Sequence, residues 1–256
     1  MLEGLYRGAR EDARAREATL PLADLVPLAR DARPVRDLSR LTPRDRVHIV
    51  AEIKRRSPSK GELADISNPV ALARAYEAGG ASVISVLTEG RGFGGSLEDL
   101  KAVSDAVSVP VLRKDFLDSE YQVVEARAHG ADLVLLILAG IDDDTATHLL
   151  EVARSWGMEA LVETHSKEEV LRAVDLGATI IGVNARDLGT FELDPELFGR
   201  LRPLLPSGVF AVAESAVVNS QDVTRYREHG AHAVLVGEAL VTGVDPEKAV
   251  REFVEA

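Results

Sequence analysis

One short pattern recurs along the chain and limits the folds that it can adopt. A Gly-Ala pair followed by a few apolar residues is found in GGASVISVL, HGADLVLLIL, LGATIIGVN and HGAHAVLVG, at residues 79–87, 129–138, 176–184 and 229–237. Each Gly follows a segment with helical spacing, as expected where a helix ends. The run after it is short and rich in β-branched residues, which is typical of a buried parallel strand. The repeated unit is therefore a helix followed by a strand.

Four further apolar runs fit the same rhythm: VHIVAEI, VPVLRK, MEALVET and VFAVAE. Together the runs predict eight strands, which begin near His48, Val83, Val109, Leu133, Ala160, Ile180, Phe210 and Val234. Eight strand–helix units in 256 residues are typical of a (β/α)8, or TIM, barrel. An open doubly wound sheet is the alternative, but it usually has a Gly-rich dinucleotide turn after its first strand. This chain has KRRSPSKG there.

The segment before the first strand is predicted to add one or two helices that cover the bottom or the side of the barrel. We therefore expect one domain over residues 1–256, with an N-terminal helical extension at 1–45 and a barrel core at 46–256. The chain has no cysteine and no apolar run of 18 residues. Its start has no apolar signal segment. These features predict a cytoplasmic protein without disulfides or thiolate metal sites.

Charge limits the partners. The formal net charge of −12 argues against nucleic acid and anionic membranes. A small phosphorylated substrate is compatible with it, but requires a local positive site. The six histidines show no metal-binding spacing, so we expect no metal. The oligomeric state is not fixed by the sequence, and a monomer is the working expectation.

Polar residues gather where the predicted strands end, which is where barrels of this class hold their active sites. They are Glu52, Lys54, Glu89, Lys114, Glu163, Asn184, Arg186, Glu214 and Ser215. Glu52 and Lys54 are two residues apart and so point to one face of a strand. A single polar residue at a strand end could simply mark the point where the strand meets solvent. That explanation fits two lysines and three glutamates on apolar runs poorly. Because buried charges are costly unless they are paired, we expect these to pair at one mouth.

The loops after the seventh and eighth strands, AESAVVNSQDV and VGEALVTG, offer backbone N–H groups, Ser215 and a glycine at a helix start, Gly237. Phosphate groups typically bind between these two loops in such barrels. Helix dipoles and nearby lysines would supply the positive site that an acidic chain needs.

These residues fit a known family. The stretch AEIKRRSPSKG, residues 51–61, resembles the signature of the indole-3-glycerol phosphate synthase family. The likeness continues in the family's order through SVLTEGRGFGGSLEDL, PVLRKDF, ALVETH, GVNARDL, AVAES and VGEALV, and covers roughly residues 47–256. The resemblance implies a lyase of tryptophan biosynthesis that needs no cofactor. Its substrate would be 1-(2-carboxyphenylamino)-1-deoxyribulose 5-phosphate, and its products indole-3-glycerol phosphate, carbon dioxide and water.

The resemblance also implies roles for individual residues. The implied catalytic residues are Lys114, Lys54, Glu163, Glu52 and Asn184. The implied substrate-binding residues are Ser57, Phe116, Arg186, Glu214, Ser215, Gly237 and Glu238. In this pattern Glu52 orients the two lysines. We expect crowding by a second lysine to lower the pKa of a catalytic lysine, an effect that pairing with Glu52 and Glu163 opposes.

Two positions depart from the family pattern. Ala216 stands where the family usually has Gly, so we expect its φ to be negative if its N–H faces phosphate. Glu238 stands where a small Ser is common, and its side chain is expected to point away and leave only the backbone N–H. The cationic segment Lys54–Gly61 is expected to act as a mobile lid.

Other functions stay open at this point. A lysine at a barrel strand end could form a Schiff base, as in aldolases, although an aldolase does not require the Glu52–Lys54 pair. A phosphoribosylanthranilate isomerase shares the barrel and the phosphate loops, but EIKRRSPS does not fit it. A phosphate-metabolite sensor on an inactive barrel would lack one of the catalytic residues, and none is missing.

Overall fold

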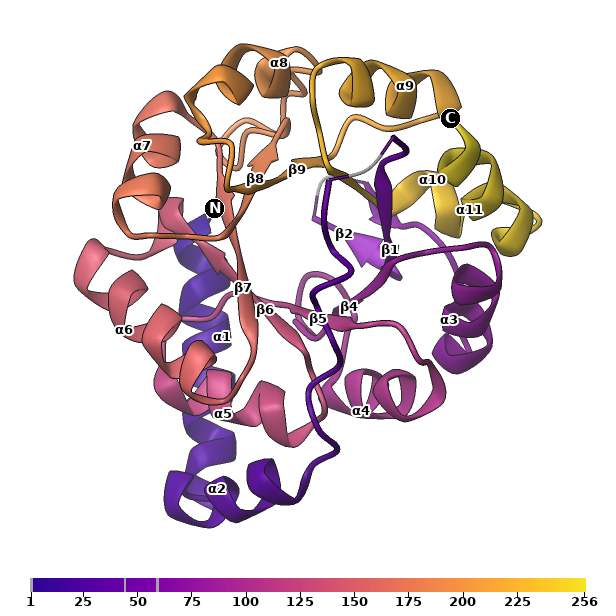
Figure 1. Cartoon of the computed structure of the whole chain (residues 1–256). Coiled ribbons are helices and arrows are strands. Elements are labelled where there is room, and N and C mark those ends of the chain that lie inside the picture. The colour runs from indigo at the N-terminus through magenta and orange to yellow at the C-terminus, as the bar shows by residue number, and fades with distance from the viewer. Residues whose placement is uncertain (1, 44, 59) are drawn as a thin grey trace.

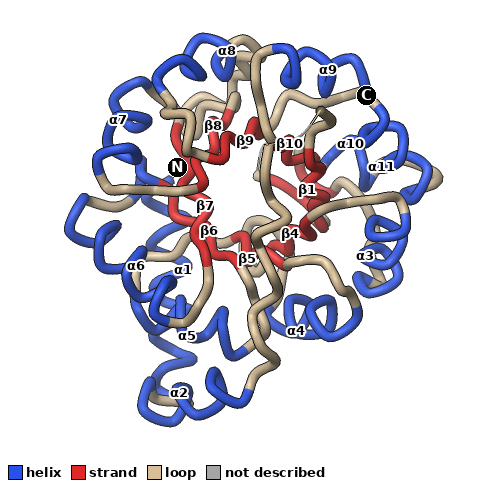
Figure 2. Tube along the Cα trace, in the orientation of Figure 1, coloured by secondary structure: helices blue, strands red, loops and turns tan. Residues whose placement is uncertain are grey.

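The computed structural model describes residues 2–43, 45–58 and 60–256. Its centre is a closed barrel of eight parallel strands, in which helices surround the strands (Figures 1 and 2). Around the barrel the strands follow the order β1, β10, β9, β8, β7, β6, β5, β4. Their bounds are β1 His48–Ile53, β4 Val83–Leu87, β5 Val111–Lys114, β6 Leu133–Ile137, β7 Glu159–Thr164, β8 Ile180–Asn184, β9 Phe210–Glu214 and β10 Ala233–Val236. This confirms the predicted (β/α)8 barrel.

The helices begin where the sequence offers capping side chains. Asn68, Ser96, Asp142 and Ser166 each accept a backbone N–H bond in the first turn of the helix that follows. The helices are α1 Leu2–Thr19, α2 Leu22–Asp31, α3 Pro69–Ala78, α4 Leu97–Ala106, α5 Glu120–Ala128, α6 Asp143–Ser155, α7 Lys167–Asp175, α8 Leu197–Leu201, α9 Ser220–Glu228, α10 Glu238–Val241 and α11 Pro246–Glu255. Two short 3-10 turns, Leu138–Gly140 and Arg202–Leu204, complete the set.

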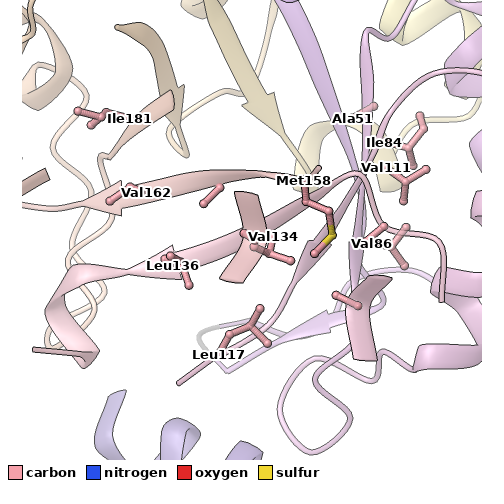
Figure 3. Packing of buried hydrophobic residues seen from close by; sticks show 14 of the residues in the cluster. Ala51, Ile84, Val86, Val111, Leu117, Val134, Leu136, Met158, Val162 and Ile181 are labelled. Atoms are coloured by element: carbon pink, nitrogen blue, oxygen red, sulfur yellow. The ribbon is translucent and has the colours of Figure 1, made fainter. Parts of the chain in front are cut away.

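The hydrophobic core has two layers because successive residues of a strand point to opposite faces. Ala51, Ile84, Val134 and Val162 belong to the layer between strands and helices (Figure 3). The alternate residues, among them Val50 and Leu161, fill the barrel interior. Glu52 and Glu163 lie two positions further along the same strands and therefore share the inward face. The alternation that builds the core thus also aims the polar residues into the mouth.

The N-terminal extension lies along the side of the barrel. α1 is tied to α5 and the segment before it by the ion pairs Arg16–Glu125 and Arg10–Asp118. Tyr6 packs edge-on against Phe116, with ring centroids 5.5 Å apart. Residues 32–43 then run to the bottom of the barrel, where Leu41 packs against the interior core. The division into 1–45 and 46–256 stays a prediction.

A short hairpin follows the first barrel strand. Its two strands, β2 (Arg56–Ser57) and β3 (Gly61–Glu62), pair antiparallel. Among the residues that the structure describes, no helix is both long enough and apolar enough to cross a membrane.

Candidate functional site

A cleft of about 320 Å³ opens at the carboxyl ends of the barrel strands. Every residue that the sequence predicts for the site lines it: Glu52, Lys54, Ser57, Lys114, Phe116, Glu163, Asn184, Arg186, Glu214, Ser215, Gly237 and Glu238. Glu89, the other acid found at a strand end, does not. Its buried carboxylate accepts the backbone N–H groups of Arg91, Gly92 and Phe93, so it holds the loop after β4.

Glu52 and Lys54 form the first ion pair of the cleft. The Nζ of Lys54 lies 2.9 Å from Oε1 of Glu52, and the hydroxyl of Ser85 donates to Oε2 at 3.3 Å. Burial would raise the pKa of Glu52, but the charges of Lys54 and Lys114 outweigh it and hold the pKa below its ordinary value. Glu52 is therefore a carboxylate that fixes one lysine in place.

Lys114 lies between two carboxyl groups. Its Nζ is 3.0 Å from Oε2 of Glu163 and 3.7 Å from Oε2 of Glu214. Burial favours the neutral amine, but the charges of Glu163, Glu214 and Glu52 dominate and raise the pKa of Lys114. The expectation of a lowered lysine pKa was wrong, because acids rather than a second lysine surround this ammonium. Lys114 is therefore a protonated ammonium that can act as a proton donor.

The two carboxyl groups beside Lys114 differ in acidity. Burial opposes ionisation of Glu163, but Lys114 and a histidine hold its pKa well below the ordinary range. Burial and the negative charge of Glu163 raise the pKa of Glu214 well above its ordinary range. Gly182, on the strand between them, leaves room for this arrangement, since an added Cβ would lie 2.0 Å from Oε1 of Glu214. A neighbouring acid and base can therefore coexist near neutral pH.

Asn184 connects Glu163 to the loop after β9. Its amide nitrogen donates to Oε1 of Glu163 at 3.0 Å, and its amide oxygen accepts from the hydroxyl of Ser215 at 2.8 Å. The backbone N–H of Arg186 donates to the same amide oxygen at 3.0 Å. These bonds fix the orientation of Glu163 through two loops.

The structure corrects the expected backbone at Ala216. Its φ is +55°, next to a φ of +67° at Ser215. The loop after β9 therefore turns through two left-handed residues, the conformation for which Gly is suited. The hydroxyl of Tyr226 donates to the carbonyl of Ser215 at 3.2 Å and supports the turn from α9.

Glu238 has a partner from outside its own loop. Its carboxylate forms an ion pair with Lys60 of the hairpin, across the rim of the cleft. The side chain is not simply turned to solvent, because the ammonium of Lys60 reaches it. Whether the segment Lys54–Gly61 moves as a lid stays a prediction, and Ser59 within it lies outside the described residues.

Sequence reasoning missed His165 and part of the apolar wall. His165 is two residues beyond Glu163, just after β7 ends, and no local pattern marked it as a partner of Glu163. Leu2 and Leu5 of α1 line the cleft together with Phe93. No local pattern marks the two leucines, because their position depends on how a distant helix docks. Among residues 2–43, 45–58 and 60–256, no group of His, Cys, Asp and Glu could hold a metal ion.

The fold and the cleft together define a (β/α)8-barrel enzyme whose site combines two lysines with three buried glutamates. The family model of indole-3-glycerol phosphate synthase matches residues 2–253. The chain belongs to the indole-3-glycerol phosphate synthase family.

Similar proteins agree with this assignment. An indole-3-glycerol phosphate synthase of Leifsonia xyli subsp. xyli is 55% identical, over 99% of this chain and 97% of that protein. One of Mycobacteroides abscessus is 52% identical, over 100% of this chain and 94% of that protein. Among solved structures, 3-hexulose-6-phosphate synthase from Salmonella typhimurium has a TM-score of 0.65 at 16% identity and covers 82% of this chain and 97% of its own. At that identity the likeness concerns the fold alone.

Proposed function

We propose that this cleft converts 1-(2-carboxyphenylamino)-1-deoxyribulose 5-phosphate into indole-3-glycerol phosphate, carbon dioxide and water, the indole-3-glycerol phosphate synthase reaction of tryptophan biosynthesis. One observation carries the proposal beyond family membership. At the floor of the cleft, the ammonium of Lys114 lies between Glu163 and Glu214. The pKa of Glu163 is lowered and the pKa of Glu214 is raised, so one is a carboxylate and the other is protonated. That is an acid–base set suited to a reaction made of proton transfers.

Ring closure is the first step. The aryl carbon that bears the carboxylate attacks the ketone carbon, and the ketone oxygen must gain a proton as its π bond breaks. Lys114 is charged and lines the cleft, so it can donate this proton. Loss of carbon dioxide then returns the electron pair to the ring and restores its aromaticity.

Dehydration completes the indole. The hydroxyl formed in the first step leaves as water after protonation, while a base removes the proton that allows the new double bond to form. Glu163 is ionised and is held by Asn184, which suits it to act as the base. The proton that the leaving hydroxyl needs would come from the carboxyl group of Glu214, whose raised pKa keeps it protonated.

The remaining residues suit the two ends of the substrate. We assign phosphate to the backbone around Ser215 and Gly237, with Lys54 near its charge. We assign the anthranilate ring to the apolar wall that includes Phe116, with Arg186 near the carboxylate. All of these residues line the same cleft.

The Schiff-base alternative is less compatible with the geometry. An amine that attacks a carbonyl must be neutral, so enzymes that use one lower the pKa of that lysine. The carboxylates around Lys114 do the opposite.

A single-turnover experiment with Glu163→Gln tests the assignment. The wild type should form the indole product and release carbon dioxide together, without added metal or cofactor. The variant should still release carbon dioxide, whereas the indole product should form slowly or not at all. Equal losses of both products would contradict a role in dehydration, and an inactive wild type would contradict the proposed function. A cytoplasmic location and a monomeric state stay predictions.

A further inference from the structure

His165 is a buried histidine that does not line the cleft. It follows Glu163 by two residues, and only 10% of its side chain is exposed. Its Nε2 lies 3.1 Å from Oε1 of Glu163, and its Nδ1 lies 3.2 Å from Oε2 of Glu169. The Nε2 contact has the distance of an ion pair but not the angle of a hydrogen bond, so it acts mainly through charge.

The start of α7 holds this arrangement in place. Ser166 caps the helix and accepts the backbone N–H of Glu169. The carboxylate of Glu169 reaches back and accepts the backbone N–H of His165 at 2.8 Å. These two bonds hold both Glu169 and His165 at the start of the helix. Glu169 is therefore a fixed partner on the outer side of the imidazole.

The two contacts define the protonation state of His165. A neutral imidazole has one N–H and one lone pair, so a neutral ring would turn its lone pair to one of the two carboxylates. A ring with both nitrogens protonated avoids this repulsion. Asp187, a further acid that interacts with the ring, acts in the same direction. Burial opposes the charge, yet the carboxylates raise the pKa of His165 to about 10.

A fixed positive charge beside Glu163 matters when Lys114 reacts. In the resting site Glu163 is balanced by Lys114 at Oε2 and by His165 at Oε1. Once Lys114 has donated its proton, the contact with His165 is the ion pair that Glu163 keeps among the described residues. Without that charge, Glu163 would take up a proton and would no longer be available as a base.

We propose that His165 is a positioning residue whose permanent positive charge keeps Glu163 ionised and oriented while Lys114 gives up its proton. This inference deepens the proposed function and depends on it for the role of Glu163. His165 itself touches no substrate, since it lies behind Glu163 and outside the cleft lining.

Two variants and a matched control test the proposal. His165→Gln removes the charge, and Glu169→Gln keeps the histidine but removes its outer partner. His148→Gln removes a histidine of α6 whose Nε2 lies 3.4 Å from Oε2 of Glu120 on α5, in an exposed pair. For His165→Gln we expect kcat to fall roughly 10- to 100-fold, the range for loss of a charge-assisted contact, with KM nearly unchanged. Glu169→Gln should give a smaller fall, and His148→Gln none.

The pH profile separates positioning from a merely structural role. An opposite charge this close lowers a carboxyl pKa by roughly 1–3 units. The acidic limb of kcat should therefore move to higher pH by a similar amount in His165→Gln. If His165→Gln had the same kcat and the same pH profile as the control His148→Gln, the proposal would be overturned.

Titration of His165 by NMR in the unmodified protein gives a readout that is independent of activity. We expect the ring to stay protonated until about pH 10. Deprotonation near pH 6.5, the ordinary histidine value, would overturn the proposal. An inactive wild type would count against the proposed function instead, and the titration would still decide the charge of His165.

Discussion

Replacing Lys114 by methionine tests the centre of the proposed mechanism. Lys114→Met keeps most of the side-chain volume but removes the ammonium that faces Glu163 and Glu214 at 3.0 and 3.7 Å. We expect kcat to fall by roughly 10²–10⁴, the usual contribution of a general acid. Substrate binding should be largely kept, because Lys54 and the loops around Ser215 and Gly237 remain.

The same substitution should lower stability by an amount that depends on pH. Removing one partner of a buried ion pair costs about 3–5 kcal/mol. The lower end applies here, since Glu163 keeps Asn184 and His165 as partners. In a domain of this size about 1 kcal/mol shifts Tm by about 2–4 °C. A loss near ~3 kcal/mol therefore predicts a decrease in Tm of roughly 6–12 °C.

The pH dependence follows from the carboxyl groups. In the wild type the depressed pKa of Glu163 contributes stability above its unfolded value near pH 4.5, and this contribution is lost as pH falls. In the variant that depression is reduced. The difference in Tm between wild type and variant should therefore stay nearly constant from pH 8 to about pH 5 and shrink as pH falls below 4.5.

Thermal unfolding and steady-state assays over this pH range measure both effects. Lys101→Met is the matched control, since Lys101 forms an exposed pair with Asp105 on α4 and should change neither quantity. Turnover within threefold of the wild type, or a Tm difference that does not vary with pH, would refute the reasoning.

Three further predictions concern the loops around the cleft. Ala216→Gly should raise the free energy of unfolding by about 1 kcal/mol, because glycine adopts the left-handed backbone of this residue without strain. The control Ala239→Gly within α10 should lower the free energy of unfolding. Chemical denaturation measures both values, and equal effects would contradict backbone strain at Ala216. Gly237→Ala would bring a Cβ within 2.7 Å of Oε1 of Glu52, so kcat/KM should fall by up to about 100-fold, whereas Gly243→Ala meets only ordinary contacts and should be silent. The exposed Lys60–Glu238 pair contributes at most about 1 kcal/mol, so hydrogen exchange at Lys54–Gly61 should be fast in the free protein and slow with a substrate analogue, and unchanged exchange would contradict the lid.

Most of the fold could be predicted from the sequence because barrel strands are local signals. The run of β-branched residues after each helix C-terminus set the eight strands to within two residues of their starts. Strand alternation likewise predicted that Glu52 and Lys54 share one face, as their ion pair shows.

The parts that could not be predicted depend on contacts between distant segments. Leu2 and Leu5 reach the cleft because α1 docks against distant segments, through contacts such as the Arg16–Glu125 and Arg10–Asp118 ion pairs. The raised pKa of Lys114 depends on acids from three other strands. The left-handed turn at Ala216 runs against residue preference, so an alanine there gave no local sign of it.

The absence of a side chain at Gly182 influences the pKa of Glu214. The two carboxyl groups of Glu163 and Glu214 sit on strands that flank β8, and each senses the other only because nothing projects from position 182. A methyl group there would force Glu214 away from its neighbour and remove the repulsion that helps keep it protonated. A redesign toward another substrate could therefore lower the pKa of Glu214 by changing a residue that takes no part in the chemistry.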